Sequence, residues 1–454
     1  MAQSLTLRIL YTEDSDKVKE HKKLINFIKA VLIIVTAAAI LCGLSRILLL
    51  KSEDGINQFQ AFYKQPENSI DVIFSGSSKV YCDIATGVLW ENYGIAAFDL
   101  AGAEAPSWVT YYQLKEALRT QKPKVFCYEV SVTAMFSQLT QANNWATDNS
   151  YGMKWNSNRI DQLRVNSTED EFLMRLNPFN IMHGRYKDLS ENDFTNVRDS
   201  VNYKGFDPRE NIHELDTPDT INITDSEPCS DKEIEYMKKL IDLTREEGIE
   251  MVMFVSPYDV SEKEMRILNY VEEFARSEGV EYIDFNKRYD DIGMDFSRDM
   301  ADTGHLGYTG NYKFTDYFGS ILKEKYDLPD HRGDDRYQSW EWDAALQDYE
   351  RNDLRIVQSE DAAQILNMVQ KGYVVFVTND DRASIFYDGE FVENGEGDYR
   401  LTYKVGEDSF LFTRDRVNNL YRLFINDDEY TGKHLNVVIV YDAVLRRYVK
   451  AIYY

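Results

Sequence analysis

Five continuous apolar runs, separated by amphipathic helical patterns, constrain the fold of this 454-residue chain more than any other feature. The runs cover residues 72–76, 95–102, 124–131, 249–257 and 280–286. The helical patterns between and after them cover residues 83–93, 105–120, 231–247, 260–278 and 308–325. Apolar runs that do not alternate in polarity are typical of strands buried on both faces of a parallel sheet. The sequence therefore predicts an α/β fold with a doubly wound, flavodoxin-like parallel sheet of about five strands.

An uncharged apolar segment lies near the N-terminus, between Lys29 and Arg46, with further apolar residues on both sides. About 20 residues cross the hydrocarbon core of a bilayer as a helix, so the stretch 24–50 is long enough to span it. A cleaved signal peptide would have a shorter apolar core. A lipoprotein cysteine at Cys42 fits poorly because Leu41 is bulky where a small residue is expected. The segment is predicted to be an uncleaved transmembrane helix.

Basic residues are more frequent before this segment than after it. Those before it are Lys17, Lys19, His21, Lys22, Lys23 and Lys29, and those closely after it are Arg46 and Lys51. Because positive charge favours the cytoplasmic side, we expect a cytoplasmic N-terminus. The chain is then a single-pass plasma-membrane protein whose remaining residues lie outside the cell.

The net charge and the cysteine content exclude several classes of function. The formal charge of −26 argues against nucleic-acid binding, which requires basic patches. The four cysteines form no disulfide framework, and no Cys-x-x-Cys or His-rich spacing indicates a zinc site. We therefore expect no metal and no cofactor. An extracytoplasmic protein without a disulfide scaffold fits a bacterial envelope better than an animal secretory pathway.

Shifts in composition predict five parts along the chain. These are a cytoplasmic tail (1–23), a transmembrane anchor (24–50), a polar spacer (51–68), a catalytic domain (69–330) and a β-rich α+β or sandwich-like module (331–454). The alternation of strands and helices pauses from 132 to 230. This insertion follows the third strand, so we expect it over the carboxyl edge of the sheet, as a lid or cap or as plain structural elaboration.

Two short polar motifs follow the first and last predicted strands. Gly76-Ser77-Ser78 comes directly after the first strand, and Asp302-Thr303-Gly304-His305 follows the last. Each is also an ordinary loop sequence, but the carboxyl ends of parallel strands share one edge, where ligands bind. A serine hydroxyl becomes a good nucleophile when a base removes its proton, and histidine suits that role at neutral pH. An Asp three residues before the His can reach the ring and fix its tautomer.

The order of these blocks resembles the SGNH/GDSL hydrolase superfamily, whose first block is a Gly-x-Ser turn and whose last is Asp-x-x-His. The resemblance covers residues 70–131 and 230–325. It implies that Ser78 is the nucleophile, His305 the general base and Asp302 the carboxylate that orients the ring. Ser77 is the less favoured nucleophile.

The oxyanion hole is the part of the site that departs from the superfamily. Gly102 follows the second strand, and its N–H together with that of Ser78 is predicted to bind the oxyanion of a tetrahedral intermediate. The third block of the superfamily commonly carries an Asn donor. Here the third strand ends Tyr128-Glu129-Val130-Ser131, so the sequence identifies no third donor.

Within the superfamily, Phe74–Ser78 and His305–Gly310 look most like a membrane-anchored branch. That branch contains the D-alanyl transfer protein of teichoic-acid modification and the alginate O-acetylation proteins. The resemblance implies an extracytoplasmic serine O-acyltransferase or esterase that acts on a cell-envelope polysaccharide or teichoic acid through an acyl-Ser78 intermediate. It also implies a membrane-bound O-acyltransferase as partner. Two alternatives are a glycan deacetylase with the same triad and a catalytically silent scaffold that binds glycan or an assembly partner through its C-terminal module.

Overall fold

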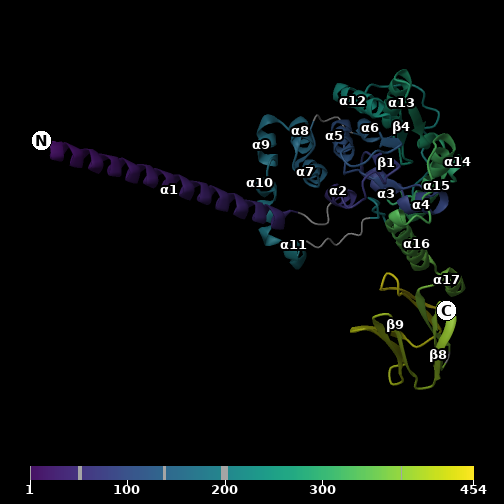
Figure 1. Cartoon of the computed structure of the whole chain (residues 1–454). Coiled ribbons are helices and arrows are strands. Elements are labelled where there is room, and N and C mark those ends of the chain that lie inside the picture. Colours follow the sequence, from purple (N-terminus) through teal and green to yellow (C-terminus); the bar gives the residue numbers. More distant parts are fainter. Residues whose placement is uncertain (1, 50–53, 136–139, 196–202, 380) are drawn as a thin grey trace. The chain divides into compact units, whose positions relative to one another are not determined.

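The computed structural model describes residues 2–49, 54–135, 140–195, 203–379 and 381–454 (Figure 1). These residues form two compact units: residues 1–60 with 138–201, and residues 61–137 with 202–454. Residue 1 of the predicted tail, residue 50 of the predicted anchor and residues 51–53 of the predicted spacer lie outside the described residues. So do residues 136–139 and 196–202 of the predicted insertion.

The N-terminal segment of the first unit is one helix, α1 (Ala2–Leu48). Its part from His21 to Leu48 is long and apolar enough to cross a membrane, by length and composition. This agrees with the predicted anchor, which overlaps the helix as far as Leu48. The direction in which the helix would cross a membrane stays a prediction.

The described part of the predicted insertion contributes short helices to the same unit as α1. They are α7 (Asn143–Tyr151), α8 (Ser157–Val165), α9 (Glu169–Arg175), α10 (Pro178–Met182), the 3₁₀ helix η1 (His183–Lys187) and α11 (Glu191–Thr195). Leu48, Ile56, Tyr151 and Met182 form their shared apolar core. The buried guanidinium of Arg175 donates to the carbonyl of Gln141, at 3.0 Å. The role of the insertion as a lid stays a prediction.

The second unit is built on a five-stranded parallel sheet. Its strands are β1 (Val72–Ser75), β2 (Ala97–Asp99), β3 (Val125–Glu129), β4 (Glu250–Val255) and β5 (Glu281–Asp284). The strands lie in the order β2-β1-β3-β4-β5, and every neighbouring pair is parallel. This is the order of flavodoxin-like doubly wound sheets. The predicted α/β fold with a five-stranded parallel sheet is confirmed.

Helices connect and cover these strands. They are α3 (Ser78–Asp83), α4 (Thr86–Tyr93), α5 (Ser107–Ala117), α12 (Asp231–Glu247), α13 (Glu262–Ser277) and α15 (Tyr308–Lys325). The helix predicted over 83–93 is observed as α4 from Thr86 to Tyr93, because Ile84 is extended and ends the preceding helix α3. The N–H of Ala85 donates to the Thr315 hydroxyl of α15, so a contact distant in sequence interrupts the local helix. Phe254, Phe285 and Phe318 pack together in the apolar core beside the sheet.

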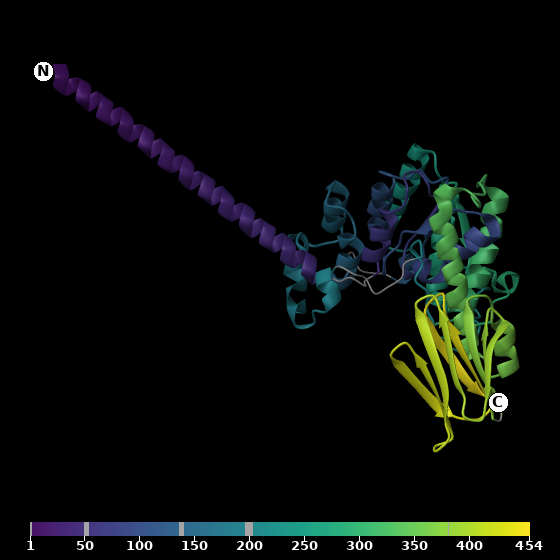
Figure 2. The same ribbon diagram turned by 60° about the horizontal axis from the view of Figure 1, so that its bottom comes forward.

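The C-terminal part of this unit is a helical connection followed by antiparallel strands (Figure 2). The predicted helical stretch 338–371 is two helices, α16 (Gln338–Gln358) and α17 (Ala362–Met368). The strands are β6 (Tyr373–Asn379), β7 (Arg382–Tyr387), β8 (Glu390–Glu396), β9 (Arg400–Val405), β10 (Asp408–Asp415), β11 (Leu420–Ile425), β12 (Asp428–Lys433), β13 (Val437–Asp442) and β14 (Arg447–Tyr453). The predicted β-rich C-terminal region is confirmed.

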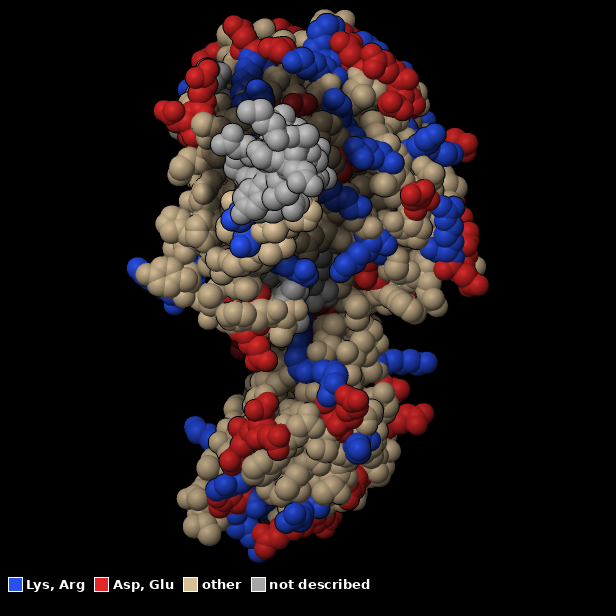
Figure 3. Space-filling view, turned by 60° about the vertical axis from the view of Figure 1, so that its left-hand side comes forward, with Lys and Arg blue, Asp and Glu red and all other residues tan. Residues whose placement is uncertain are grey.

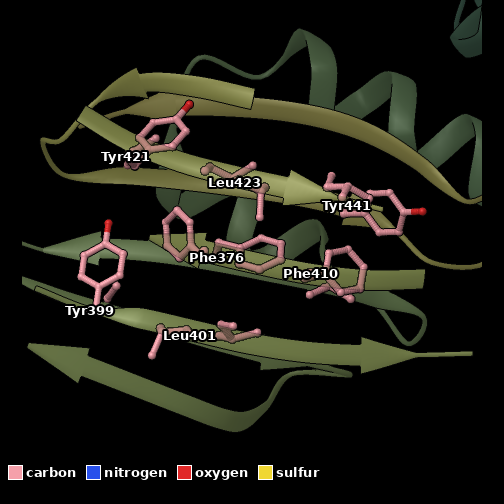
Figure 4. Packing of buried hydrophobic residues seen from close by; sticks show 14 residues of the cluster. Phe376, Tyr399, Leu401, Phe410, Tyr421, Leu423 and Tyr441 are labelled. Carbon is pink, nitrogen blue, oxygen red and sulfur yellow. The ribbon is translucent and has the colours of Figure 1, made fainter. Parts of the chain in front are cut away.

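These strands form two antiparallel sheets, with the orders β12-β11-β10-β9 and β14-β13-β6-β7-β8. Both sheets contribute to one core, shown in Figure 4. Phe376 of the larger sheet, for example, lies 5.6 Å from Phe410 of the smaller one, between ring centroids. The two sheets therefore face each other as a sandwich.

Helix α16 also packs on the parallel-sheet part of the unit. The buried Trp340 side chain donates through Nε1 to the carbonyl of Ala97 in β2, at 3.1 Å. Its ring contacts Trp90 of α4 and Tyr337. The residues from 331 onward thus share one compact unit with the sheet, and the predicted boundary at residue 331 stays a prediction.

Candidate active site

The turn after β1 presents the hydroxyl of Ser78 at the carboxyl edge of the sheet. Gly76 has φ of +142°, and a Cβ there would lie 2.7 Å from the carbonyl oxygen of Glu129. Only glycine fits this close approach without displacing β3. Ser77 is the N-cap of α3, and its hydroxyl accepts from the N–H of Lys79. Ser78 is therefore the first helical residue, and its side chain is partly exposed.

The structure brings together the three residues that the sequence predicts as a triad. His305 Nε2 lies 2.8 Å from Ser78 Oγ, although 227 positions separate the two residues. His305 Nδ1 lies 3.0 and 2.9 Å from the two carboxylate oxygens of Asp302. With the ring proton on Nδ1, the imidazole donates to Asp302, and Nε2 accepts from the serine hydroxyl. This is the hydrogen-bond chain in which a histidine can take a proton from a serine.

The Asp302 carboxylate is held in its ionised form. Burial alone would raise its pKa, but the His305 ring and the N–H groups of Gly304 and His305 outweigh this effect and hold the pKa well below its ordinary value. The Gly304 and His305 amides donate to Asp302 Oδ1 at 2.7 and 2.9 Å. The same carboxylate thus holds its own loop together and orients the ring.

Two side chains of α3 bind this loop to the serine helix. Lys79 is buried, and its Nζ donates to the carbonyl of Gly304 at 2.6 Å. Its ammonium also lies 4.2 Å from the ring centroid of Tyr258. The Asp83 carboxylate accepts from the N–H of Leu306 at 2.9 Å. The residues on both sides of His305 are therefore fixed to the helix that begins with Ser78.

Glu129, the last residue of β3, is fully buried beneath the turn. Its carboxylate accepts from the Ser77 hydroxyl at 3.0 Å and from the N–H and hydroxyl of Ser131, each also at 3.0 Å. Burial raises its pKa, while the charge of Lys79 and the hydrogen bonds from the two serines act in the opposite direction. The Ser77 hydroxyl is therefore bound to Glu129, whereas the Ser78 hydroxyl is bound to His305, so the two serines have different roles.

The two N–H groups predicted as oxyanion donors, those of Ser78 and Gly102, differ in their hydrogen bonding. The N–H of Ser78 is at the first position of α3, where helical amides have no intrahelical acceptor. The N–H of Gly102 donates to the carbonyl of Gly76 at 3.2 Å. To bind an oxyanion, the Gly102 N–H would have to give up this hydrogen bond to Gly76. The oxyanion role of Gly102 stays a prediction.

Sequence reasoning identified Ser78, His305 and Asp302 but missed Lys79, Asp83 and Glu129. The signal for Glu129 is a carboxylate inside the apolar run 124–131, where an unpaired charge would be costly. The signal for Lys79 is weaker, because a lysine in a short helix is usually exposed. Among the residues that the structure describes, no group of three or more His, Cys, Asp and Glu side chains could hold a metal ion.

Comparison with known proteins adds little to this geometry. No protein-family model matches the chain, and no curated protein matches it. Among solved structures, the chain is similar to a gut microbial diltiazem-metabolizing enzyme, with 12% sequence identity and a TM-score of 0.25. The match covers 77% of this chain and 57% of that chain, so this chain spans little more than half the length of that enzyme. A likeness this weak carries no inference about function.

Proposed function

We propose that this protein is a membrane-anchored serine acyltransferase or esterase of the SGNH/GDSL type, whose substrate is a cell-envelope glycan. The observation that carries the proposal is the continuous hydrogen-bond chain Ser78–His305–Asp302, with 2.8 Å between the hydroxyl and the ring. Its position at the carboxyl edge of a parallel sheet is where ligands bind in this architecture. The apolar helix near the N-terminus supports attachment to the membrane.

The first half of the reaction would form a covalent acyl-enzyme. Ser78 Oγ attacks the carbonyl carbon of an acyl ester while His305 Nε2 takes the hydroxyl proton. The negative charge on the carbonyl oxygen would be stabilised by the N–H of Ser78, and by that of Gly102 once it leaves Gly76. When the intermediate collapses, the alcohol leaves with the proton from His305, and the acyl group remains as an ester on Ser78. Asp302 stabilises the imidazolium that exists between these steps.

The second half regenerates the serine. A glycan hydroxyl or a water molecule gives its proton to His305 Nε2 and attacks the acyl-Ser78 ester. The glycan hydroxyl yields an acylated glycan, and water yields the free acid. Acylation of a glycan outside the cell needs a donor that carries the acyl group across the membrane, so a membrane-bound O-acyltransferase is the proposed partner.

A fluorophosphonate probe tests the nucleophile, because it reacts covalently with activated serines. We expect labelling of the full-length protein, its loss in Ser78→Ala and in His305→Ala, and its retention in Ser77→Ala. A folded protein that is neither labelled nor able to hydrolyse an acetyl ester would contradict the proposal and favour the non-catalytic scaffold.

The direction of acyl flux needs a different measurement. A transferase and a glycan deacetylase would share the triad and the acyl-Ser78 intermediate. The acetyl content of the envelope glycan after deletion of the gene distinguishes them. It should fall if the protein transfers acyl groups and rise if the protein removes them.

A further inference from the structure

A groove in the C-terminal sandwich lies outside the triad and has the lining of a ligand site. Its volume is about 680 Å³, and it is lined by residues from β10, β11, β12, β13 and β14 and from two hairpin turns. This volume falls within the range of about 300–1,000 Å³ that small-molecule sites have. The lining combines tyrosines with charged and amide side chains, which is the mixture expected for a polar ligand with an apolar face.

The aromatic part of the lining is a stacked pair of tyrosines. Tyr430 belongs to β12 and Tyr448 to β14, which are edge strands of the two different sheets. Their ring centroids are 4.6 Å apart and their planes differ by 9°. Both side chains are partly exposed. Both rings line the groove and also pack against the sandwich core, so the stacked pair forms an ordered aromatic part of the lining.

The polar part of the lining is held in place by one buried carboxylate. Asp408 accepts from Arg446 Nη2 at 2.7 Å, from Asn426 Nδ2 at 3.0 Å and from the Tyr441 hydroxyl at 2.8 Å. Arg446 has φ of +55°, a left-handed conformation that is costly for arginine and that the hairpin turn after β13 imposes. The guanidinium is therefore positioned before any ligand arrives, which lowers the entropic cost of binding.

The charges of the lining favour an uncharged ligand. The lining contributes two carboxylates, Asp408 and Asp428, and two guanidinium groups, Arg446 and Arg447. Arg446 is paired with Asp408 at 2.7 Å and with Glu407 at 2.9 Å, and Arg447 is paired with Asp353 of α16 at 2.7 Å. Both arginine charges are therefore already compensated, so the groove does not attract an anion. On the C-terminal part of the face that Figure 3 presents, at the bottom of the view, acidic and basic side chains are interspersed. A polyanion would meet a chain whose formal charge is −26.

We propose that this groove binds a short segment of uncharged glycan. A pyranose ring has an apolar face of C–H groups that packs on an aromatic ring, and hydroxyls at its edge that bond to charged and amide groups. In this groove the ring would lie against the Tyr430–Tyr448 pair. Its hydroxyls would bond to the exposed Asp428 carboxylate and to the N–H groups of Arg446 that neither Asp408 nor Glu407 occupies. The site is independent of the triad and would hold a glycan whether or not the triad is catalytic.

The test is a calorimetric titration of the full-length chain in detergent with three neutral probes: cellohexaose, chitohexaose and maltohexaose. We expect saturable binding of at least one of them. Tyr430→Ala should weaken it by about tenfold or more, a factor that corresponds to ~1.4 kcal/mol. Asp428→Asn should weaken it severalfold, and this change is on an exposed side chain and does not touch the core. Ser78→Ala should bind as the unchanged protein does.

Tyr403→Ala is the matched control. Tyr403 packs against the same sandwich core and pairs with Tyr387, with ring centroids 6.0 Å apart, but it does not line the groove. It should bind the glycan with unchanged affinity. The proposal is overturned if none of the three probes binds, if Asp428→Asn and Tyr430→Ala both bind normally, or if Tyr403→Ala weakens binding as much as Tyr430→Ala.

Discussion

The replacement of Lys79 by methionine is the most informative single change near the triad. Lys79 is buried, donates to the Gly304 carbonyl at 2.6 Å and lies over the Tyr258 ring. Two fully buried carboxylates, Glu129 and Asp83, lie close enough for its charge to affect them. Methionine has a similar length without the charge, so the change removes the electrostatic part and keeps much of the packing.

The size of the effect follows from these contacts. A hydrogen bond that involves a charged group contributes about 1.5–3 kcal/mol. Removal of one partner from a buried charge pair costs about 3–5 kcal/mol. These contributions overlap, so we expect the free energy of unfolding to fall by about 3 kcal/mol at neutral pH. Lys79→Arg should lose less, because it keeps the charge.

The pH dependence of this loss distinguishes charge compensation from packing. Burial raises the pKa of Glu129 and of Asp83, and the Lys79 charge opposes this rise. In Lys79→Met the pKa of these groups should therefore rise further. A carboxyl whose pKa is raised in the folded state adds stability below its unfolded pKa and loses that contribution as pH rises through the folded value. The loss of stability in Lys79→Met relative to the unchanged protein should therefore grow once the pH rises above the folded pKa values that these carboxyls have in the unchanged protein. The growth should be up to ~1.4 kcal/mol per pH unit for each carboxyl that stays protonated only in the variant.

Urea unfolding of the purified protein at about pH 5 and about pH 8 measures this difference. Lys239→Met is the matched control, because Lys239 also lies over a tyrosine ring, at 3.9 Å, but is partly exposed. It should change the free energy of unfolding by no more than about 0.5 kcal/mol at either pH. An equal loss at both pH values in Lys79→Met would refute the charge argument and leave only packing.

Three further predictions concern the same site. Glu129→Gln replaces an acceptor of three hydrogen bonds by a group with one acceptor atom, so urea unfolding should show a loss of about 1–3 kcal/mol, and an unchanged midpoint would contradict the assigned contacts. Gly76→Ala places a Cβ 2.7 Å from the Glu129 carbonyl oxygen at a φ of +142°. This substitution should lower the free energy of unfolding, measured with urea, by about 1–3 kcal/mol or more. It should also slow fluorophosphonate labelling. Asp302→Asn should slow labelling by about 10²–10⁴-fold, because the neutral amide no longer fixes and stabilises the His305 ring. The low pKa of Asp302 in the folded protein implies that its stabilising contribution is present above its ordinary pKa of 3.8 and is lost as pH falls below that value. Asp302→Asn should therefore unfold with less dependence on pH in this acidic range, and an unchanged acid profile would count against the assignment.

The sequence predicted the parts of the fold that depend on local patterns. The five apolar runs became the five parallel strands, each shortened at one or both ends. Helix α12 begins directly after its cap residue Ser230 and ends directly before Gly248, where φ is +69°, as the Glu-Gly signal indicated. The triad was predictable because its members follow the first and last strands, and the ends of parallel strands share an edge by geometry alone.

The parts that the sequence did not predict depend on contacts between distant residues. The sequence does not show which partner compensates a charged residue in an apolar setting. The arrangement of Lys79, Glu129 and Asp83 could therefore be found only from the structure. The interruption between α3 and α4 depends on Thr315, far along the chain. The Gly102 amide looked free from its place after a strand, but the adjacent turn supplies the Gly76 carbonyl as its acceptor.

The most direct test of the proposed chemistry is the isolation of the acyl-enzyme. The full-length protein is mixed with p-nitrophenyl acetate, quenched in acid while turnover continues, and digested for peptide mass spectrometry. We expect an acetyl ester on Ser78 that accumulates in the unchanged protein and is absent in His305→Ala. Acetylation on Ser77, or no acetylated serine in a folded protein that still hydrolyses the ester, would contradict it.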